Sequence, residues 1–195
     1  MTKTLKPGKL FVISAPSGAG KTTLKDKLTE VFPNLKYSIS ATTRPMREGE
    51  VNGQHYYFKT LGEFEALIES GDFVEYNRVH NNYYGTLKAP IDNLLSRGYH
   101  VIFDLDVYGK INFDKCYPNA VGVLILPPSL EELERRLKKR QSEDNETLQL
   151  RLKNAKDEME FAQNKGKYEY RVINDQLEDA VKKITGIFKM EMDQA

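Results

Sequence analysis

Residues 14 to 23 read Ser14-Ala15-Pro16-Ser17-Gly18-Ala19-Gly20-Lys21-Thr22-Thr23, and this stretch decides the fold. An apolar run from Leu10 to Ser14 precedes it, and a helical pattern from Thr22 to Val31 follows. A glycine-rich loop between a strand and a helix, closed by a lysine and a threonine, is typical of a phosphate-binding loop. Its backbone N–H groups and the helix N-terminus direct partial positive charge toward one point. The stretch therefore predicts an anion-binding turn within an α/β domain.

The side chains of this loop complement its backbone. Lys21 would neutralise charge on the β- and γ-phosphates of ATP, and the Thr22 hydroxyl would ligate magnesium. The strict pattern has glycine at the position of Ala15, so an ordinary glycine turn is the alternative interpretation. The residues that we assign to ATP in this loop are Ala15, Pro16, Ser17, Gly18, Ala19, Gly20, Lys21, Thr22 and Thr23.

Further apolar runs alternate with helical patterns downstream. Strands buried on both faces are predicted by aliphatic and β-branched residues at Val101 to Leu105, Val121 to Leu126 and Tyr170 to Ile173. A helix is predicted from Ser129 to Lys139, and its first residue forms a capping-box pattern with Glu132. This alternation predicts an α/β fold with a three-layer P-loop core and a parallel sheet.

The stretch from residue 36 to residue 86 has a different pattern. Short aromatic-rich runs, punctuated by glycines, predict small strands at Tyr37 to Ser40, His55 to Phe58 and Phe73 to Val79. One helix interrupts them after a second capping box, Thr60 with Glu63. We therefore expect a P-loop core at 1–35 and 87–195 and a small mixed β insertion at 36–86, together forming one catalytic unit.

Two carboxylates, Asp104 and Asp106, lie at the end of the strand predicted at 101–105. Strand alternation places both on one side, and the carboxyl edge of a parallel sheet faces the ligand. We expect Asp104 to hold magnesium through water, as acidic residues at this place do in P-loop enzymes. A pair of turn residues is the alternative.

The insertion carries candidates for an acceptor site. Arg44 and Arg47 flank Pro45, and two guanidinium forks suit a phosphate dianion. Tyr56 and Tyr84 would add hydroxyl donors. By composition alone, solvated arginines and half-buried packing tyrosines remain the alternative.

Several segments share the order and spacing of one family. They are the loop at 14–23, Ser38-Ile39-Ser40-Ala41-Thr42-Thr43-Arg44-Pro45-Met46-Arg47-Glu48-Gly49-Glu50, Phe73-Val74-Glu75, Asn82-Tyr83-Tyr84-Gly85-Thr86 and Asp104-Leu105-Asp106. From Leu10 to about Phe188 the chain resembles the guanylate kinases. The resemblance implies an ATP:GMP phosphotransferase of purine nucleotide metabolism that uses Mg²⁺ with ATP. It also implies that the insertion binds GMP through Ser40, Arg44, Arg47, Tyr56, Glu75, Tyr84, Thr86 and Asp106.

The chemistry of guanine agrees with the assignment of Glu75. Guanine presents N1–H and an exocyclic amino group as adjacent donors, whereas adenine has an acceptor at N1. A carboxylate would accept from guanine, and the wrong base would leave buried polar groups unpaired. Without the resemblance, Glu75 would be an ordinary strand carboxylate.

The resemblance further implies a helical lid at about 136–151 whose arginines stabilise the transferring phosphoryl group. Pairing of Arg136 with Glu132 within one helix is the alternative. The catalytic residues implied in this way are Lys21, Arg44, Arg136, Arg140 and Arg151.

Asn174 and Asp175 match the family's turn on the adenine side, and a simple turn before a helix is the alternative. The chain departs from the family pattern at Gln141-Ser142, where Gly-Thr is common, and at Tyr108, where glutamine is usual. Neither departure removes a charged residue that the resemblance implies in binding or catalysis.

Charge and composition narrow the partners. Lysine and arginine total 29 against 28 acidic residues, and a net charge of +1 predicts no broad attraction to nucleic acid or to an anionic membrane. The apolar runs are far shorter than a membrane helix, we identify no signal peptide, and the single cysteine, Cys116, fits a reducing cytoplasm. We expect a cytoplasmic enzyme with ATP and GMP as substrates and no obligate protein partner. A peptide-binding module of the same fold and a related kinase with another acceptor are the rival hypotheses.

Overall fold

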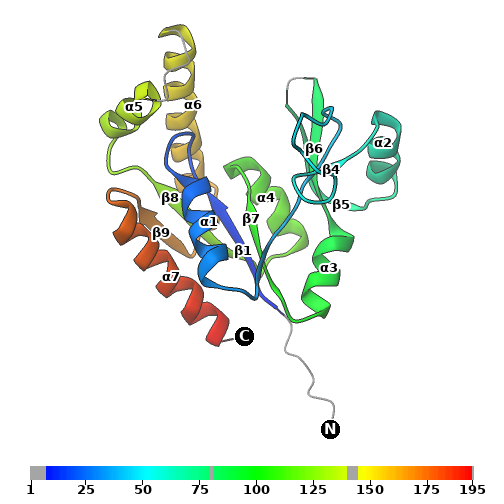
Figure 1. Cartoon of the computed structure of the whole chain (residues 1–195). Coiled ribbons are helices and arrows are strands. Elements are labelled where there is room, and N and C mark those ends of the chain that lie inside the picture. The colour runs from blue at the N-terminus through cyan, green and yellow to red at the C-terminus, as the bar shows by residue number, and fades with distance from the viewer. Residues whose placement is uncertain (1–7, 80, 140–144, 195) are drawn as a thin grey trace.

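The core of the molecule is a five-stranded parallel sheet in the order β2-β7-β1-β8-β9 (Figure 1). The computed structural model describes residues 8–79, 81–139 and 145–194. The strands of this sheet are β1 (Leu10–Ser14), β2 (Leu35–Tyr37), β7 (His100–Asp104), β8 (Val121–Leu126) and β9 (Tyr170–Ile173). The strands predicted at 10–14, 101–105, 121–126 and 170–173 are confirmed, and β2 is an additional edge strand.

Helices cover both faces of this sheet, because alternate residues of β1 point to opposite sides. Phe11 and Ile13 pack with α1 and α7, and Phe11 stacks on Phe188 at a ring distance of 4.1 Å. Val12 packs on the other face with Ile91 of α3 and Phe113 of α4. The three-layer α/β core is therefore confirmed. The helices are α1 (Lys21–Val31), α2 (Leu61–Glu69), α3 (Lys88–Ser96), α4 (Val107–Cys116), α5 (Leu130–Lys139), α6 (Asn145–Asn164) and α7 (Leu177–Asp193).

A second, mixed sheet has the order β4-β3-β6-β5. Its strands are β3 (Ala41–Thr42), β4 (Tyr57–Phe58), β5 (Phe73–Val79) and β6 (Asn82–Leu87). Helix α2 packs beside it through Phe64, which stacks on Phe73 at 4.3 Å. The capping box at Thr60 and Glu63 is present. Within the described ranges, none of the helices is both long and apolar enough to cross a membrane.

The strand predicted at Tyr37 to Ser40 is wrong. Tyr37 instead belongs to β2 of the core sheet, and the Ser38 N–H still donates to the Ile102 carbonyl at 2.9 Å. The chain leaves the core sheet only after this bond, so the second sheet begins at Ala41. The domain boundaries at residues 36 and 86 stay a prediction.

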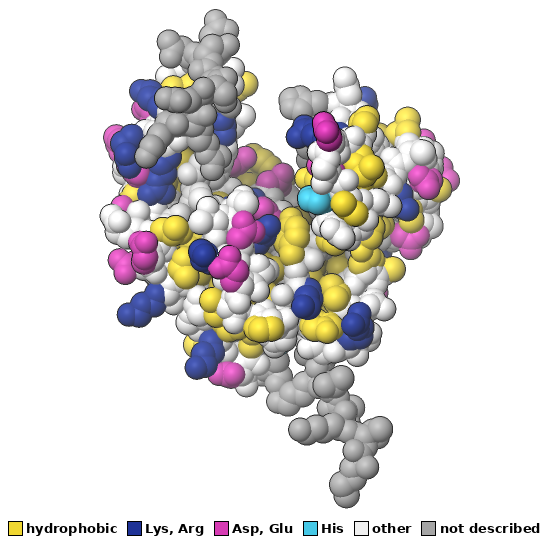
Figure 2. Space-filling view, viewed as in Figure 1, with side chains coloured by type: hydrophobic (Ala, Val, Ile, Leu, Met, Phe, Trp, Pro, Cys, Tyr) yellow, Lys and Arg dark blue, Asp and Glu magenta, His cyan; other side chains and the backbone are white. Residues whose placement is uncertain are grey.

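The two sheets and the last helices frame the carboxyl edge of the core sheet. Helices α5 and α6 stand on one side of that edge, and the second sheet with α2 stands on the other (Figure 1). Figure 2 shows the surface hollowed between these two projections. The loop after β1 stands at the end of α1, on the side of α5 and α6 (Figure 1).

Candidate active site

The loop between β1 and α1 requires glycine at two positions. Gly18 and Gly20 have φ values of +89° and +90°, a region that other residues rarely adopt. A Cβ on Gly20 would collide with the Asn174 side-chain nitrogen, and one on Gly18 would lie 2.9 Å from a Leu137 methyl carbon. The loop is thus packed against the end of β9 and against α5.

The loop surrounds a polar cavity of about 310 Å³. The residues that line it are Ala15, Pro16, Ser17, Gly18, Gly20, Lys21, Thr22, Thr23, Asp106 and Glu158. The Lys21 ammonium group forms an ion pair with Asp104 and donates to the Leu105 carbonyl at 3.4 Å. The Asp104 carboxylate and the Leu105 carbonyl therefore hold the loop lysine at the edge of the cavity.

The turn after β9 ties the loop to α5. Asn174 is buried, and its side-chain nitrogen donates to the Ala19 carbonyl at 2.8 Å. Arg136 donates to the Asn174 carbonyl at 2.8 Å and to the Asp175 carbonyl at 3.2 Å. Arg136 also forms an ion pair with Glu132 of the same helix at 2.7 Å. It therefore makes both the pairing within α5 and the contact with the turn.

The capping box predicted at the start of α5 is only half formed. The Glu132 N–H donates to the Ser129 hydroxyl at 3.2 Å, but the Glu132 carboxylate accepts from Arg135 and Arg136. These arginines lower the pKa of Glu132 to about 2. Two arginine side chains thus bind the Glu132 carboxylate, which in a complete capping box would accept from the Ser129 backbone N–H.

A second arginine of the predicted lid reaches the loop from α6. Arg151 donates to the Ser17 hydroxyl at 2.8 Å. Arg140 and the departure at Gln141-Ser142 lie outside the described residues. Tyr108, the other departure, lies against Phe161 of α6 with a ring distance of 4.5 Å.

A second polar cavity of about 290 Å³ lies between the two sheets. The residues that line it are Tyr37, Ser40, Tyr56, Glu75, Asn77, Tyr84, Gly85, Asp104, Leu105, Asp106 and Gly109. Asp106 also lines the loop cavity, so this one residue borders both. Its side chain caps α4 by accepting from the Gly109 N–H at 2.6 Å.

Glu75 lines this second cavity and is hydrogen-bonded to Thr86, which is not among the lining residues. The buried Thr86 hydroxyl donates to one Glu75 carboxylate oxygen at 2.6 Å. Burial raises the pKa of Glu75, the Thr86 hydrogen bond opposes this, and the nearby Asp106 charge adds to it. The cavity wall therefore presents the Glu75 carboxylate, one oxygen of which already accepts from Thr86.

The two insertion arginines lie apart from the described lining of this cavity. Arg44 pairs with Glu50 at 2.6 Å and donates to the Pro45 carbonyl at 2.8 Å. Glu50 also accepts from the Arg47 backbone N–H at 2.7 Å, and the Arg44 hydrogen bond is the main cause of its pKa falling to about 2. The Arg44 guanidinium lies 5.4 Å from the Tyr56 ring, beside the cavity.

Among the described residues of this region, sequence reasoning missed four polar side chains. Tyr37, Asn77 and Glu158 line the two cavities, and Glu50 holds Arg44. The sequence could have indicated Asn77, because alternate residues of a strand lie on the same face and Asn77 is two residues after Glu75. For Glu158 the sequence offers no local signal, because its place follows from the packing of α6.

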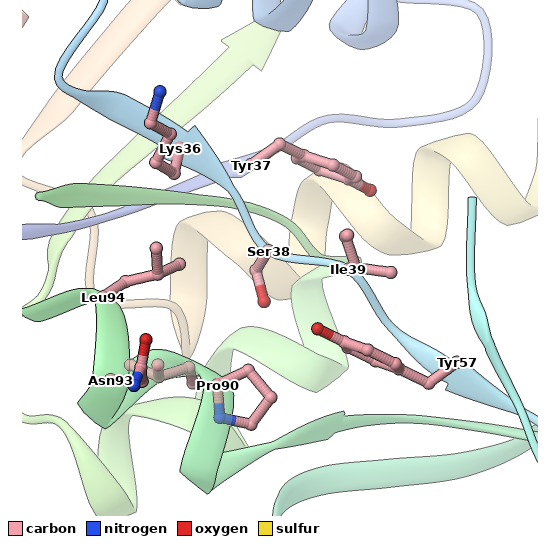
Figure 3. A pocket seen from close by; sticks show the side chains of 9 residues that line it. Lys36, Tyr37, Ser38, Ile39, Tyr57, Pro90, Asn93 and Leu94 are labelled. Carbon is pink, nitrogen blue, oxygen red and sulfur yellow. The ribbon is translucent and has the colours of Figure 1, made fainter. Parts of the chain in front are cut away.

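Tyr37 also borders a third cavity of about 460 Å³, on the side of α3. Figure 3 shows Ser38 and Tyr57 facing one another across it, with Pro90 and Leu94 on the α3 side. The ring of Tyr37 is covered by the Lys25 ammonium group at 4.1 Å. This tyrosine therefore separates the third cavity from the polar cavity between the sheets.

A phosphate-binding loop at the carboxyl edge of a parallel sheet, with a second polar cavity sharing one of its carboxylates, defines a P-loop phosphotransferase. The family model described as guanylate kinase matches residues 7–191. The chain belongs to the guanylate kinase family.

Individual relatives agree with the family match. A guanylate kinase of Rickettsia felis is 43% identical over 188 residues, which are 96% of each chain. A guanylate kinase of Chlorobium luteolum is 44% identical over 178 residues, 91% of this chain and 89% of the relative. The crystal structure of guanylate kinase from Anaplasma phagocytophilum aligns with a TM-score of 0.72 at 29% identity and covers 96% of this chain and 87% of that one.

Proposed function

We propose that this chain transfers the γ-phosphoryl group of ATP to GMP and so produces ADP and GDP. The loop cavity takes the phosphates of ATP, and the cavity between the sheets takes GMP. The observation that carries this proposal is the position of Asp106, which borders both cavities and so brings donor and acceptor to one point. The reaction proceeds by positioning and charge neutralisation, with no covalent intermediate on the protein.

On the donor side, the backbone amides of the loop and Lys21 hold the β- and γ-phosphates. Lys21 exchanges its bond with Asp104 for phosphate oxygens. Arg136 and Arg151 supply positive charge to the transferring group as the lid approaches. Both arginines are already in contact with the loop or with the turn beside it.

On the acceptor side, Glu75 and Thr86 select guanine, and Arg44, Arg47, Tyr56 and Tyr84 hold the GMP phosphate. Arg44 must leave Glu50 or share it, because its guanidinium group is paired there. Ser40 and Asp106 complete the nucleoside contacts. Closure around both substrates excludes water, which would otherwise accept the phosphoryl group.

We propose Mg²⁺ as the metal that accompanies ATP. The described residues hold no group of three or more His, Cys, Asp or Glu side chains that suits a metal ion. Mg²⁺ does not need such a group, because it takes one or two protein oxygens plus water and substrate phosphates. The Thr22 hydroxyl in the cavity and the Asp104 carboxylate beside it fit that donor set. Mg²⁺ held there would neutralise negative charge that develops on the phosphates during transfer.

An acceptor panel tests this function. Purified protein is given ATP with GMP, AMP, CMP or UMP, in the presence and in the absence of Mg²⁺, and nucleoside diphosphate formation is measured. We expect GMP to be used far faster than the other three and turnover to require Mg²⁺. Equal use of all four acceptors would refute the assignment of the second cavity and leave the loop assignment standing.

A further inference from the structure

A carboxylate lies inside the cavity that is built for phosphates. Glu158 of α6 is half-buried and lines the loop cavity together with the loop residues. Its helix also places Arg151 against the Ser17 hydroxyl at 2.8 Å. Residues 151, 155 and 158 share one face of the helix, and Ala155 on that face is buried in an apolar cluster with Leu133 and Leu137 of α5.

The groups that hold Glu158 are groups that a phosphate would use. Ser17 and Lys21 line the same cavity as Glu158, and the Lys21 ammonium group and the Ser17 backbone N–H both favour the ionised carboxylate and lower its pKa. Burial and the negative charge of Asp106 act against the ionised form and raise the pKa of Glu158. Any anion at the position of the Glu158 carboxylate is thus attracted by the Ser17 backbone N–H and by Lys21, and it is repelled by Asp106.

We propose that Glu158 is a built-in competitor for the phosphates of the donor nucleotide. Its carboxylate takes the place of a phosphate oxygen at the Ser17 N–H, and a nucleotide must displace it to engage the loop. This inference rests on the proposed function, because it requires the loop to bind ATP and ADP.

Such a competitor has a consequence for turnover. Repulsion between Glu158 and the bound phosphates weakens ATP and ADP alike, and it favours departure of ADP once the phosphoryl group has gone. Glu158 and Arg151 lie on one helix, and Arg151 reaches Ser17. A movement of α6 that withdraws the carboxylate would also move this arginine. Binding of nucleotide is thereby coupled to the position of α6.

The test measures ADP binding by calorimetry at low salt, once with Mg²⁺ and once with a chelator. The variant is Glu158→Gln, which keeps shape and removes charge. The matched control is Asp157→Asn, which removes the same charge from the adjacent, exposed position of α6. Thermal melting verifies that each variant is folded.

We expect Glu158→Gln to bind ADP about tenfold more tightly, with or without Mg²⁺, because a like charge near the phosphates is gone. The gain shrinks at high salt, and Asp157→Asn stays within about twofold of the wild type. Unchanged or weaker binding by folded Glu158→Gln overturns the proposal, and a loss seen only with Mg²⁺ assigns Glu158 to the metal instead. Failure of the wild type to bind ADP overturns the proposed function as well, so the two failures are distinguishable.

Discussion

Replacing Glu75 by glutamine tests how this chain recognises its acceptor. The Thr86 hydroxyl donates to one Glu75 oxygen at 2.6 Å, which leaves the other oxygen for the base. In Glu75→Gln the amide oxygen is the only acceptor left for Thr86. When the bond donated by the Thr86 hydroxyl is kept, the amide NH₂ group faces the cavity, where guanine presents its own donors.

The magnitude follows from the bonds that are lost. Hydrogen bonds to a charged partner contribute about 1.5–3 kcal/mol each, and guanine offers two donors. Allowing for water that reaches the cavity, we expect a loss of about 3–4 kcal/mol, or roughly 10²- to 10³-fold in kcat/KM for GMP. The kcat/KM for AMP falls much less, because adenine gains a donor opposite its N1.

The assay is steady-state turnover with GMP and AMP for four proteins: the wild type, Glu75→Gln, Thr86→Val and the double variant. Thr86→Val frees the amide to rotate its oxygen toward guanine, so the double variant should use GMP better than Glu75→Gln alone. The coupling energy of this cycle isolates the Glu75–Thr86 interaction. If Glu75→Gln keeps GMP turnover within about threefold of the wild type, the carboxylate does not read the base.

Three further outcomes are expected. Arg151→Ala should lower kcat on the order of 10³-fold while the KM for GMP changes less than about threefold, as single-turnover and steady-state kinetics will measure. Asn174→Ala should lower the free energy of unfolding by about 1–3 kcal/mol and raise the KM for ATP, since the Ala19 carbonyl loses its buried donor; urea melts and kinetics check both. Glu75→Gln should be more stable than the wild type at neutral pH, and the difference should vanish in acid. Burial raises the pKa of Glu75 in the folded state, so the native protein binds the extra proton first and wild-type stability rises as the pH falls through that value.

The sequence could predict the core because its signals are local. An apolar run, a glycine loop and a leucine-faced helix lie within about twenty consecutive residues, and β1, the loop and α1 form there. Parallel strands that are buried on both faces have continuous apolar sequences, so the run at Val121–Leu126 predicts β8 equally well. The capping box at Thr60 needs only three neighbouring positions, and it is present as expected.

The remaining features depend on contacts between distant segments. Whether Tyr37 continues β2 or begins the second sheet is decided by pairing with Ile102, which lies 65 residues away. Glu132 matches a capping box in sequence, yet its carboxylate is taken by arginines one turn later. Glu158 lies in the cavity only because α6 packs across the loop.

The two substrate sides differ in how firmly they are joined to the core. At Asn174, the backbone N–H donates to the Leu126 carbonyl, the side chain donates to Ala19, and the carbonyl accepts from Arg136. One residue thus joins the end of β8, the glycine loop and α5 through hydrogen bonds, so the backbone of the proposed donor side is held before a nucleotide arrives. Arg44 is held by Glu50 beside the acceptor cavity and away from its described lining. We therefore expect the rearrangement for catalysis on the proposed acceptor side, at Lys21 and in the contacts of α6, where charged groups exchange partners and the buried packing of the core sheet is left unchanged.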